Sequence, residues 1–201
     1  NEVRLRLAIF VAQFLDDAHK VAQNREYTTY SGTLLGEKVS VTSTGIGCPS
    51  VAIAVEELAQ IGADTFIRVG FSGGMQNFLT LGDLVIATAS IRDEGTSQQY
   101  MPLAFPAVAN IDVVLALRDG ARLAGAPHHL GIIHSKDSFY GETQPQRMPL
   151  AHQLQERWRA WVQGGALCSE MEAATLFVVS SVLGKRAGGI MLVRAITGTG
   201  A

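Results

Sequence analysis

The sequence has few cysteines, few charged residues and no long hydrophobic run. Two cysteines among 201 residues cannot form a disulfide framework, and no group of Cys and His has the spacing of a zinc site. The 16 Lys and Arg nearly balance the 18 Asp and Glu, so there is no basic footprint for nucleic acid or membrane headgroups. The apolar run at 173–183 is shorter than the ~20 residues of a spanning helix. We therefore expect a cytoplasmic protein that acts on small molecules, with no nucleic-acid or membrane partner.

Glycine and apolar residues are abundant instead. The 21 glycines and the 47% hydrophobic content favour a sheet-rich α/β core with tight turns. Strands are expected at 27–30, 32–35, 39–44, 65–69, 84–89, 130–134 and 187–193, and helices at 51–61, 111–124, 154–162 and 170–183. Residues 16–24 are expected to end a helix that begins near Ala8, and residues 139–149 to form a polar loop. No repeat or linker interrupts this pattern, which predicts a single α/β domain over residues 1–201.

Arg68 lies within an otherwise apolar strand that leads into a glycine-rich turn. Glycines after a buried strand let backbone N–H groups approach an anion, and a forked guanidinium beside them can bind phosphate. A structural arginine paired with an acid fits the same position equally well. The pattern leaves both interpretations open.

Glu170 and Glu172 are expected to begin the helix at 170–183. Acidic residues are favoured in a first turn because they compensate the helix dipole. A carboxylate that accepts hydrogen bonds from two adjacent hydroxyls can instead recognise a ribose.

Residues 137–147 combine aromatic, amide and guanidinium side chains. The Phe139 ring can stack on a flat heterocycle while Gln144 and Arg147 read its polar edge. An exposed loop with two buried aromatic residues is the alternative. Arg25 and Glu26 taken alone are typical of a solvated charge pair.

Taken together, these segments resemble the nucleoside phosphorylase superfamily, and within it the uridine phosphorylase family. The matching runs are STGIG at 43–47, VEEL at 55–58, IRVG at 67–70, SGG at 72–74, LGD at 81–83, ATAS at 87–90, DSFY at 137–140 and EME at 170–172. The resemblance implies a three-layer α/β/α domain with a mixed, barrel-like central sheet. It also implies reversible phosphorolysis of uridine, or of another pyrimidine nucleoside, to free base and ribose 1-phosphate. Inorganic phosphate is then the co-substrate, and no organic cofactor is implied.

The resemblance also assigns roles to individual residues. It implies that Arg68 and Glu172 are catalytic, with Arg68 on the phosphate and Glu172 on the ribose hydroxyls. The implied substrate-binding residues are Arg25 from a neighbouring subunit, Ser72, Gly73, Phe139, Gln144, Arg147, Glu170 and Met171. The implied metal site, for potassium or calcium at the interface of a homodimer, consists of Glu26, Ile46 and Ser50. The resemblance leaves two assemblies open, this homodimer or a hexamer that is a trimer of such dimers.

The sequence departs from the family pattern at several places. The N-terminal Gly-Asp-Pro-x-Arg phosphate loop and the C-terminal helix of the family have no counterpart, so we expect the domain to lack both. Phe71 stands where the family usually has threonine. Alignment from Phe139 places Glu142 and Gln144 at the uracil-reading Gln-x-Arg, whereas Gln144 and Arg147 offer that chemistry at another spacing.

Three alternatives remain open. Purine nucleoside phosphorylases that resemble this fold carry an aspartate near the last strand, which protonates the purine N7. Residues 190–197 contain no acid, so this alternative is disfavoured. A nucleoside hydrolase of the same fold needs no phosphate-binding arginine, so Arg25 and Arg68 favour phosphorolysis. A non-catalytic nucleoside-binding homologue would suit the bulky Phe71.

Overall fold

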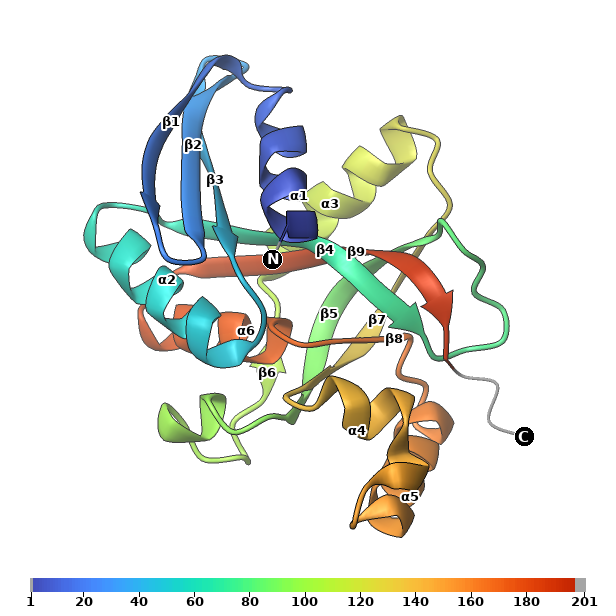
Figure 1. Cartoon of the computed structure of the whole chain (residues 1–201). Helices are drawn as coiled ribbons and strands as arrows, with labels where there is room; N and C mark the ends of the chain where they lie inside the picture. Colours follow the sequence, from blue (N-terminus) through green and yellow to red (C-terminus); the bar gives the residue numbers. More distant parts are fainter. Residues whose placement is uncertain (1, 198–201) are drawn as a thin grey trace.

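A computed structural model describes residues 2–197, with side chains from residue 7 onward, and shows two sheets flanked by helices (Figure 1). The helices are α1 (Glu2–Ala12), α2 (Cys48–Gln60), α3 (Ile111–Leu123), α4 (Phe139–Thr143), α5 (Ala151–Gln163) and α6 (Ala173–Val182), with 3₁₀ turns η1 (Ser97–Gln99) and η2 (Pro145–Arg147). The strands are β1 (Asp16–Asn24), β2 (Tyr27–Leu34), β3 (Glu37–Thr44), β4 (Thr65–Gly74), β5 (Leu84–Asp93), β6 (Ala107–Val108), β7 (His128–Lys136), β8 (Cys168–Glu170) and β9 (Arg186–Ile196). The expectations about the last four residues, 198–201, lie outside the described part of the chain.

The larger sheet closes on itself. Its strand order is β6-β5-β7-β8-β4-β9, and an additional β5–β9 pairing joins five of these strands into a ring. The β5–β7, β7–β8 and β4–β9 pairs are parallel, whereas β4–β8 and β5–β9 are antiparallel. The predicted α/β class with a mixed, barrel-like sheet is confirmed.

Helix α6 is buried around its whole circumference. Every residue from Ala173 to Ser180 is buried, and the helix packs against α2 and against the barrel strand β9. A helix that is apolar on all sides belongs in a core rather than at a surface. No helix within residues 2–197 is long and apolar enough to cross a membrane.

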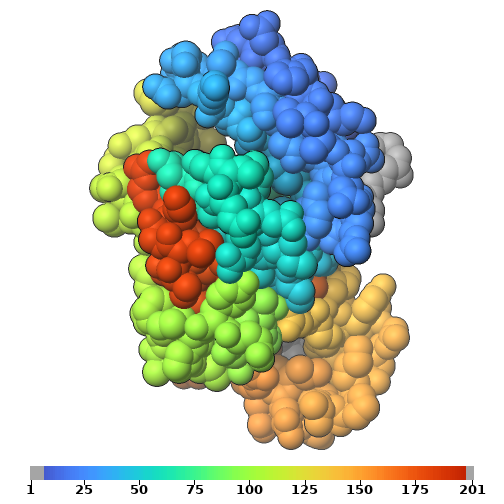
Figure 2. Space-filling view, turned by 90° about the vertical axis from the view of Figure 1, so that its left-hand side faces the viewer, coloured from blue at the N-terminus to red at the C-terminus, as the bar shows by residue number. Residues whose placement is uncertain are grey.

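The smaller sheet and the α4–α5 unit project from opposite ends of the barrel (Figures 1 and 2). The smaller sheet is an antiparallel meander in the order β1-β2-β3. The predicted helix through residues 16–24 is therefore wrong, since α1 ends at Ala12 and Asp16–Asn24 is strand β1. Every residue of β1 is exposed, so no periodic burial marks it as a strand, and its pairing with β2 decides the conformation.

The predicted helix start at residue 170 is also wrong. Glu170 ends the short strand β8, and α6 begins only at Ala173. The Glu170 carboxylate accepts the backbone N–H of Glu172 at 2.8 Å and that of Ala173 at 3.0 Å. Glu170 thus satisfies N–H groups at the start of the helix from outside it. The loop predicted at 139–149 contains α4 and η2, while η1 and β6 were not predicted.

Asn110 caps helix α3. Its side-chain oxygen accepts the backbone N–H groups of Asp112 at 3.1 Å and Val113 at 3.3 Å. We expect Asn110→Ala to lower the free energy of unfolding by about 1 kcal/mol, whereas Asn110→Asp keeps the acceptor and most of the stability. Urea unfolding of both variants measures the difference, and an alanine variant as stable as the parent would contradict the capping role.

Candidate active site

Arg68 on β4 lies between the two carboxylates that the sequence singled out. Its Nε donates to Glu170 Oε2 at 2.6 Å, and its Nη2 forms an ion pair with Glu172 Oε2. The side chains of Arg68, Glu170 and Glu172 are only 11%, 0% and 2% exposed. Arg68 is thus paired with acids, and that pairing fixes the plane of its guanidinium.

The guanidinium of Arg68 is held in its charged form. Burial opposes the charged form, but Glu172 and Glu170 outweigh it and raise the pKa of Arg68 above its ordinary value. A guanidinium carries five N–H donors, and the two ion pairs use those of Nε and Nη2. Within residues 2–197, Nη1 donates to no acceptor. The cluster therefore retains donors that suit an anion such as phosphate.

Gly70 makes room for this guanidinium. It lies two residues beyond Arg68 on the same face of β4, and a Cβ built there would stand 2.0 Å from Arg68 Nη1. The missing side chain is what allows the arginine to lie along the strand. This role of Gly70 was not predicted, although its position two residues after Arg68 is visible in the sequence.

Two further segments hold the carboxylates in place. The backbone N–H of Gly47, just before α2, donates to Glu172 Oε1 at 2.8 Å. The hydroxyl of Ser135 on β7 donates to Glu170 Oε1, and the oxygen of that Ser135 hydroxyl accepts the N–H of Ala174 at 2.9 Å. Neither partner was predicted, although Gly47 belongs to the STGIG run. Carboxylates fixed in this way present their oxygens in one orientation, as selective recognition of hydroxyl pairs requires.

Other predicted site residues lie around this cluster. Met171 stands between Glu170 and Glu172 and is partly buried. Ser72 is buried on β4, and Gly73 pairs directly with Ser169 across the β4–β8 ladder. These three predicted residues thus lie on β4 or beside the two glutamates of the cluster.

The aromatic segment forms a group of its own. Phe139 packs edge-on against Tyr140 with ring centroids 5.4 Å apart, and both rings are about half exposed. Arg147 Nη1 donates to Gln144 Oε1 at 2.5 Å, and its guanidinium lies 5.6 Å from the centre of the Tyr140 ring. Within residues 2–197, no hydrogen bond or ion pair joins Gln144 or Arg147 to the Arg68 cluster. Gln144 and Arg147, which are predicted to bind the polar edge of the base, therefore contact each other and not the Arg68 cluster.

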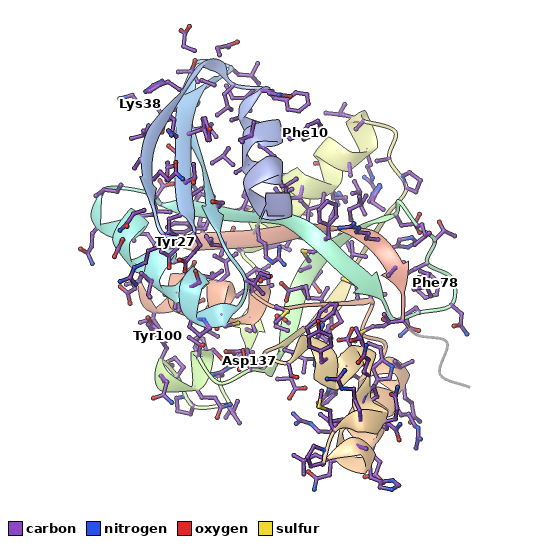
Figure 3. All side chains as sticks on the ribbon, in the orientation of Figure 1. Phe10, Tyr27, Lys38, Phe78, Tyr100 and Asp137 are labelled. Carbon is purple, nitrogen blue, oxygen red and sulfur yellow. The ribbon has the colours of Figure 1, made fainter. Side chains whose placement is uncertain are left out.

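The predicted metal residues are partly brought together. Ser50 Oγ donates to Glu26 Oε1 at 2.9 Å, and Ser50 also accepts, through its carbonyl, the hydroxyl of Tyr27 beside α2 (Figure 3). Hydrogen bonds from its own backbone and from Ser50 hold the pKa of Glu26 below its ordinary value. Ile46 lies in the adjoining turn with an exposed side chain. A carboxylate, a hydroxyl and a backbone carbonyl make an all-oxygen donor set of the kind hard cations prefer.

A second group of potential metal ligands is less suitable. Cys48, Glu94 and Asp137 (the last labelled in Figure 3) each place one ligand atom within 4.8 Å of the others. Burial raises the pKa of the Cys48 thiol, which keeps it protonated. Glu94 already accepts hydrogen bonds from Ser97 and Thr175, at 2.9 and 3.0 Å. We therefore interpret this group as structural.

A buried polar cluster that the sequence did not reveal lies beside β8. Lys136 at the end of β7 donates to Ser169 Oγ at 2.7 Å and forms a 2.6 Å ion pair with Glu142. His134, on the same strand, lies 3.1 Å from Ser169 Oγ through Nδ1 and 3.0 Å from Asp93 Oδ2 through Nε2. Asp93, Glu142 and Ser169 come from β5, α4 and β8, so their contacts with the two β7 residues arise only in the folded chain.

His134 gives the fold a pH dependence. Burial, and then the Lys136 ammonium, lower its pKa from 6.5 to about 4, against the opposing carboxylates of Glu142 and Glu170. Between pH 6.5 and 4 the unfolded chain therefore binds a proton that the folded chain does not, and stability falls as the pH falls. We expect this group to account for a loss of about 3 kcal/mol across that window. Thermal unfolding from pH 7 to 4 should show a steeper loss for the parent than for His134→Gln, and equal slopes would contradict the assignment.

Comparisons with known proteins show the family of this chain. The profile of a family described as "Phosphorylase superfamily" matches residues 3–201. A uridine phosphorylase from Treponema pallidum is 51% identical over 183 residues, which are 91% of this chain and 71% of that protein. A uridine phosphorylase from Thermococcus kodakarensis is 46% identical over 190 residues, 92% of this chain and 68% of that protein. A guanosine phosphorylase from Halorubrum lacusprofundi is 40% identical over 183 residues, 91% of this chain and 71% of that protein.

Proposed function

Because this chain belongs to the phosphorylase superfamily, we propose that it is a pentosyltransferase that catalyses the reversible phosphorolysis of uridine to uracil and ribose 1-phosphate. The buried guanidinium of Arg68, bracketed by Glu170 and Glu172, is the observation that carries the proposal. It offers a permanent cation for phosphate directly beside carboxylates that can accept ribose hydroxyls. The relationship to uridine phosphorylases supports uridine as the nucleoside.

The reaction needs positioning and electrostatic stabilisation rather than a protein nucleophile. Arg68 holds the phosphate, and Glu172 accepts the ribose hydroxyls, assisted by Glu170 and Met171. A phosphate oxygen forms the bond to C1′ while the bond from C1′ to the base nitrogen breaks and its electron pair leaves with the base. The proton lost by the phosphate on ester formation balances the proton the base takes up. A buried Cys168, whose pKa burial raises to about 12, is unsuited to nucleophilic attack.

The base binds at the end of the barrel in this proposal. Gly73 and Ser72 line its pocket, Phe139 packs against its face, and Gln144 and Arg147 read its polar edge. Support comes from the Arg147–Gln144 hydrogen bond, which holds an amide and a guanidinium in one unit. A donor pair of this kind matches the two carbonyl oxygens of uracil.

The catalytic unit in this proposal is a cytoplasmic homodimer, assembled further into a hexamer. Arg25 is exposed at the tip of the β1–β2 turn with a φ of 51°, where its side chain is available to a neighbouring subunit. Glu26, Ser50 and the carbonyl of Ile46 would hold a potassium or calcium ion at the interface. Such an ion would supply positive charge that neutralises Glu26 where two copies meet.

One assay tests the activity. Purified protein is incubated with uridine, inosine, adenosine or guanosine, each with and without phosphate, and the free base is followed. Uracil release that depends on phosphate is expected. Release without phosphate would indicate a hydrolase, release of a purine base in preference to uracil would indicate a purine phosphorylase, and binding without release would indicate a nucleoside-binding protein.

A further inference from the structure

Lys136 is a buried cation with no role in the reaction described so far. Its side chain is 9% exposed, and its Nζ donates to Ser169 Oγ at 2.7 Å and to Glu142 at 2.6 Å. An ammonium carries three N–H donors, so these two contacts leave one hydrogen. Within residues 2–197, no third acceptor takes it.

The two partners of Lys136 place it at the proposed base pocket. Ser169 lies directly opposite Gly73 in the β4–β8 ladder. Glu142 stands three residues after Phe139 in helix α4, and so about one turn further along. The ammonium therefore lies between β8, which pairs with Gly73 of β4, and α4, which carries Phe139.

We propose that Lys136 is a further catalytic residue, which donates its third hydrogen to the departing base and stabilises the negative charge that the base gains. This inference rests on the proposed function. When the bond between C1′ and the base nitrogen breaks, its electron pair spreads onto the ring carbonyl oxygens of uracil. A hydrogen bond from the ammonium to such an oxygen strengthens as that charge grows, so it lowers the barrier more than it tightens binding of the nucleoside.

The other cation near the proposed pocket is less suited to this role. Arg147 is exposed and already bonded to Gln144, whereas the Lys136 side chain is withdrawn from water. An electrostatic interaction is stronger where water is excluded. In the proposed reaction Arg68 binds the phosphate that attacks C1′, whereas Lys136 stabilises the base that leaves it.

The test compares two leaving groups. We expect Lys136→Met to lower kcat/KM for uridine about 100-fold, with most of the loss in kcat. The loss should be several-fold smaller for 5-fluorouridine, because the electron-withdrawing fluorine already stabilises the departing anion. A purely structural lysine would slow both substrates equally, and equal losses, or no loss, would overturn the proposal.

Two further variants complete the experiment. Lys136→Met leaves Glu142 buried without its partner, so the double variant Lys136→Met/Glu142→Gln removes both charges and should show the same difference between the substrates. Lys185→Met is the matched control, because Lys185 precedes β9 at the end of the β4–β9 pair that is remote from Gly73. Its rates should match those of the parent. If the parent itself releases no uracil, the proposed function fails, whereas an active parent with equal losses in the variants refutes Lys136 alone.

Discussion

Arg68→Ala is expected to lower kcat/KM for phosphate-dependent uracil release by about 10²–10³-fold or more. Arg68 is a buried cation of the candidate site, and its ion pairs with Glu170 and Glu172 fix its guanidinium before any ligand arrives. Its removal takes away the proposed phosphate donors together with their orientation. Initial rates measured across a range of phosphate concentrations should show the loss, and turnover near that of the parent would contradict the role in phosphate binding.

The same substitution should also destabilise the fold. Without the guanidinium, Glu170 and Glu172 remain as two buried carboxylates that repel each other. Leaving buried charges without their counterion costs about 3–5 kcal/mol, so thermal unfolding must be measured beside the activity. Arg68→Lys keeps a cation near both acids but loses the forked N–H donors of the guanidinium. It should therefore be more stable than Arg68→Ala while binding phosphate weakly. Arg186→Ala, at the other end of the β4–β9 pair and 53% exposed, is the control expected to leave both properties unchanged.

Local sequence patterns predicted the helices and strands that have regular apolar periodicity. The helix at α3 and the strands β3, β5 and β9 follow from apolar periodicity bounded by turn residues, within a few residues of their observed ends. Strand β1 was missed because its nine exposed residues lack alternation and become a strand only by pairing with β2. Strand β8 was missed because three residues are too few for a periodic signal, and the helix that follows them is strongly apolar.

In the candidate site, too, some features were predictable from the sequence and others were not. Arg68, Glu170 and Glu172 were identifiable because a charge in an apolar strand and paired acids before an apolar helix are unusual in sequence. Their orientation was not identifiable, because it depends on the Gly47 amide and the Ser135 hydroxyl, which are distant in the chain. Lys136 was overlooked for the same reason, since its partners come from β8 and α4.

Gly70→Ala is expected to lower kcat/KM about 100-fold although it adds only one methyl group. That methyl would stand 2.0 Å from Arg68 Nη1, a separation that no pair of unbonded heavy atoms tolerates. A flexible arginine at a surface would swing aside at little cost. Arg68 cannot do so freely, because any displacement breaks its 2.6 Å ion pair with Glu170 or its contact with Glu172 in a buried setting. The Michaelis constant for phosphate should rise, and the melting temperature should fall.

Gly120→Ala separates this effect from the general consequence of adding a methyl to glycine. Gly120 lies within α3, where an added Cβ meets nothing within 4 Å. Alanine there should raise the free energy of unfolding by about 0.5–1 kcal/mol and leave activity unchanged, because the helical propensity of alanine exceeds that of glycine. The two substitutions are chemically identical and should have opposite signs in stability. A fully active Gly70→Ala enzyme would show that the guanidinium need not lie along β4, and that the ion pairs with Glu170 and Glu172 do not position it for phosphate.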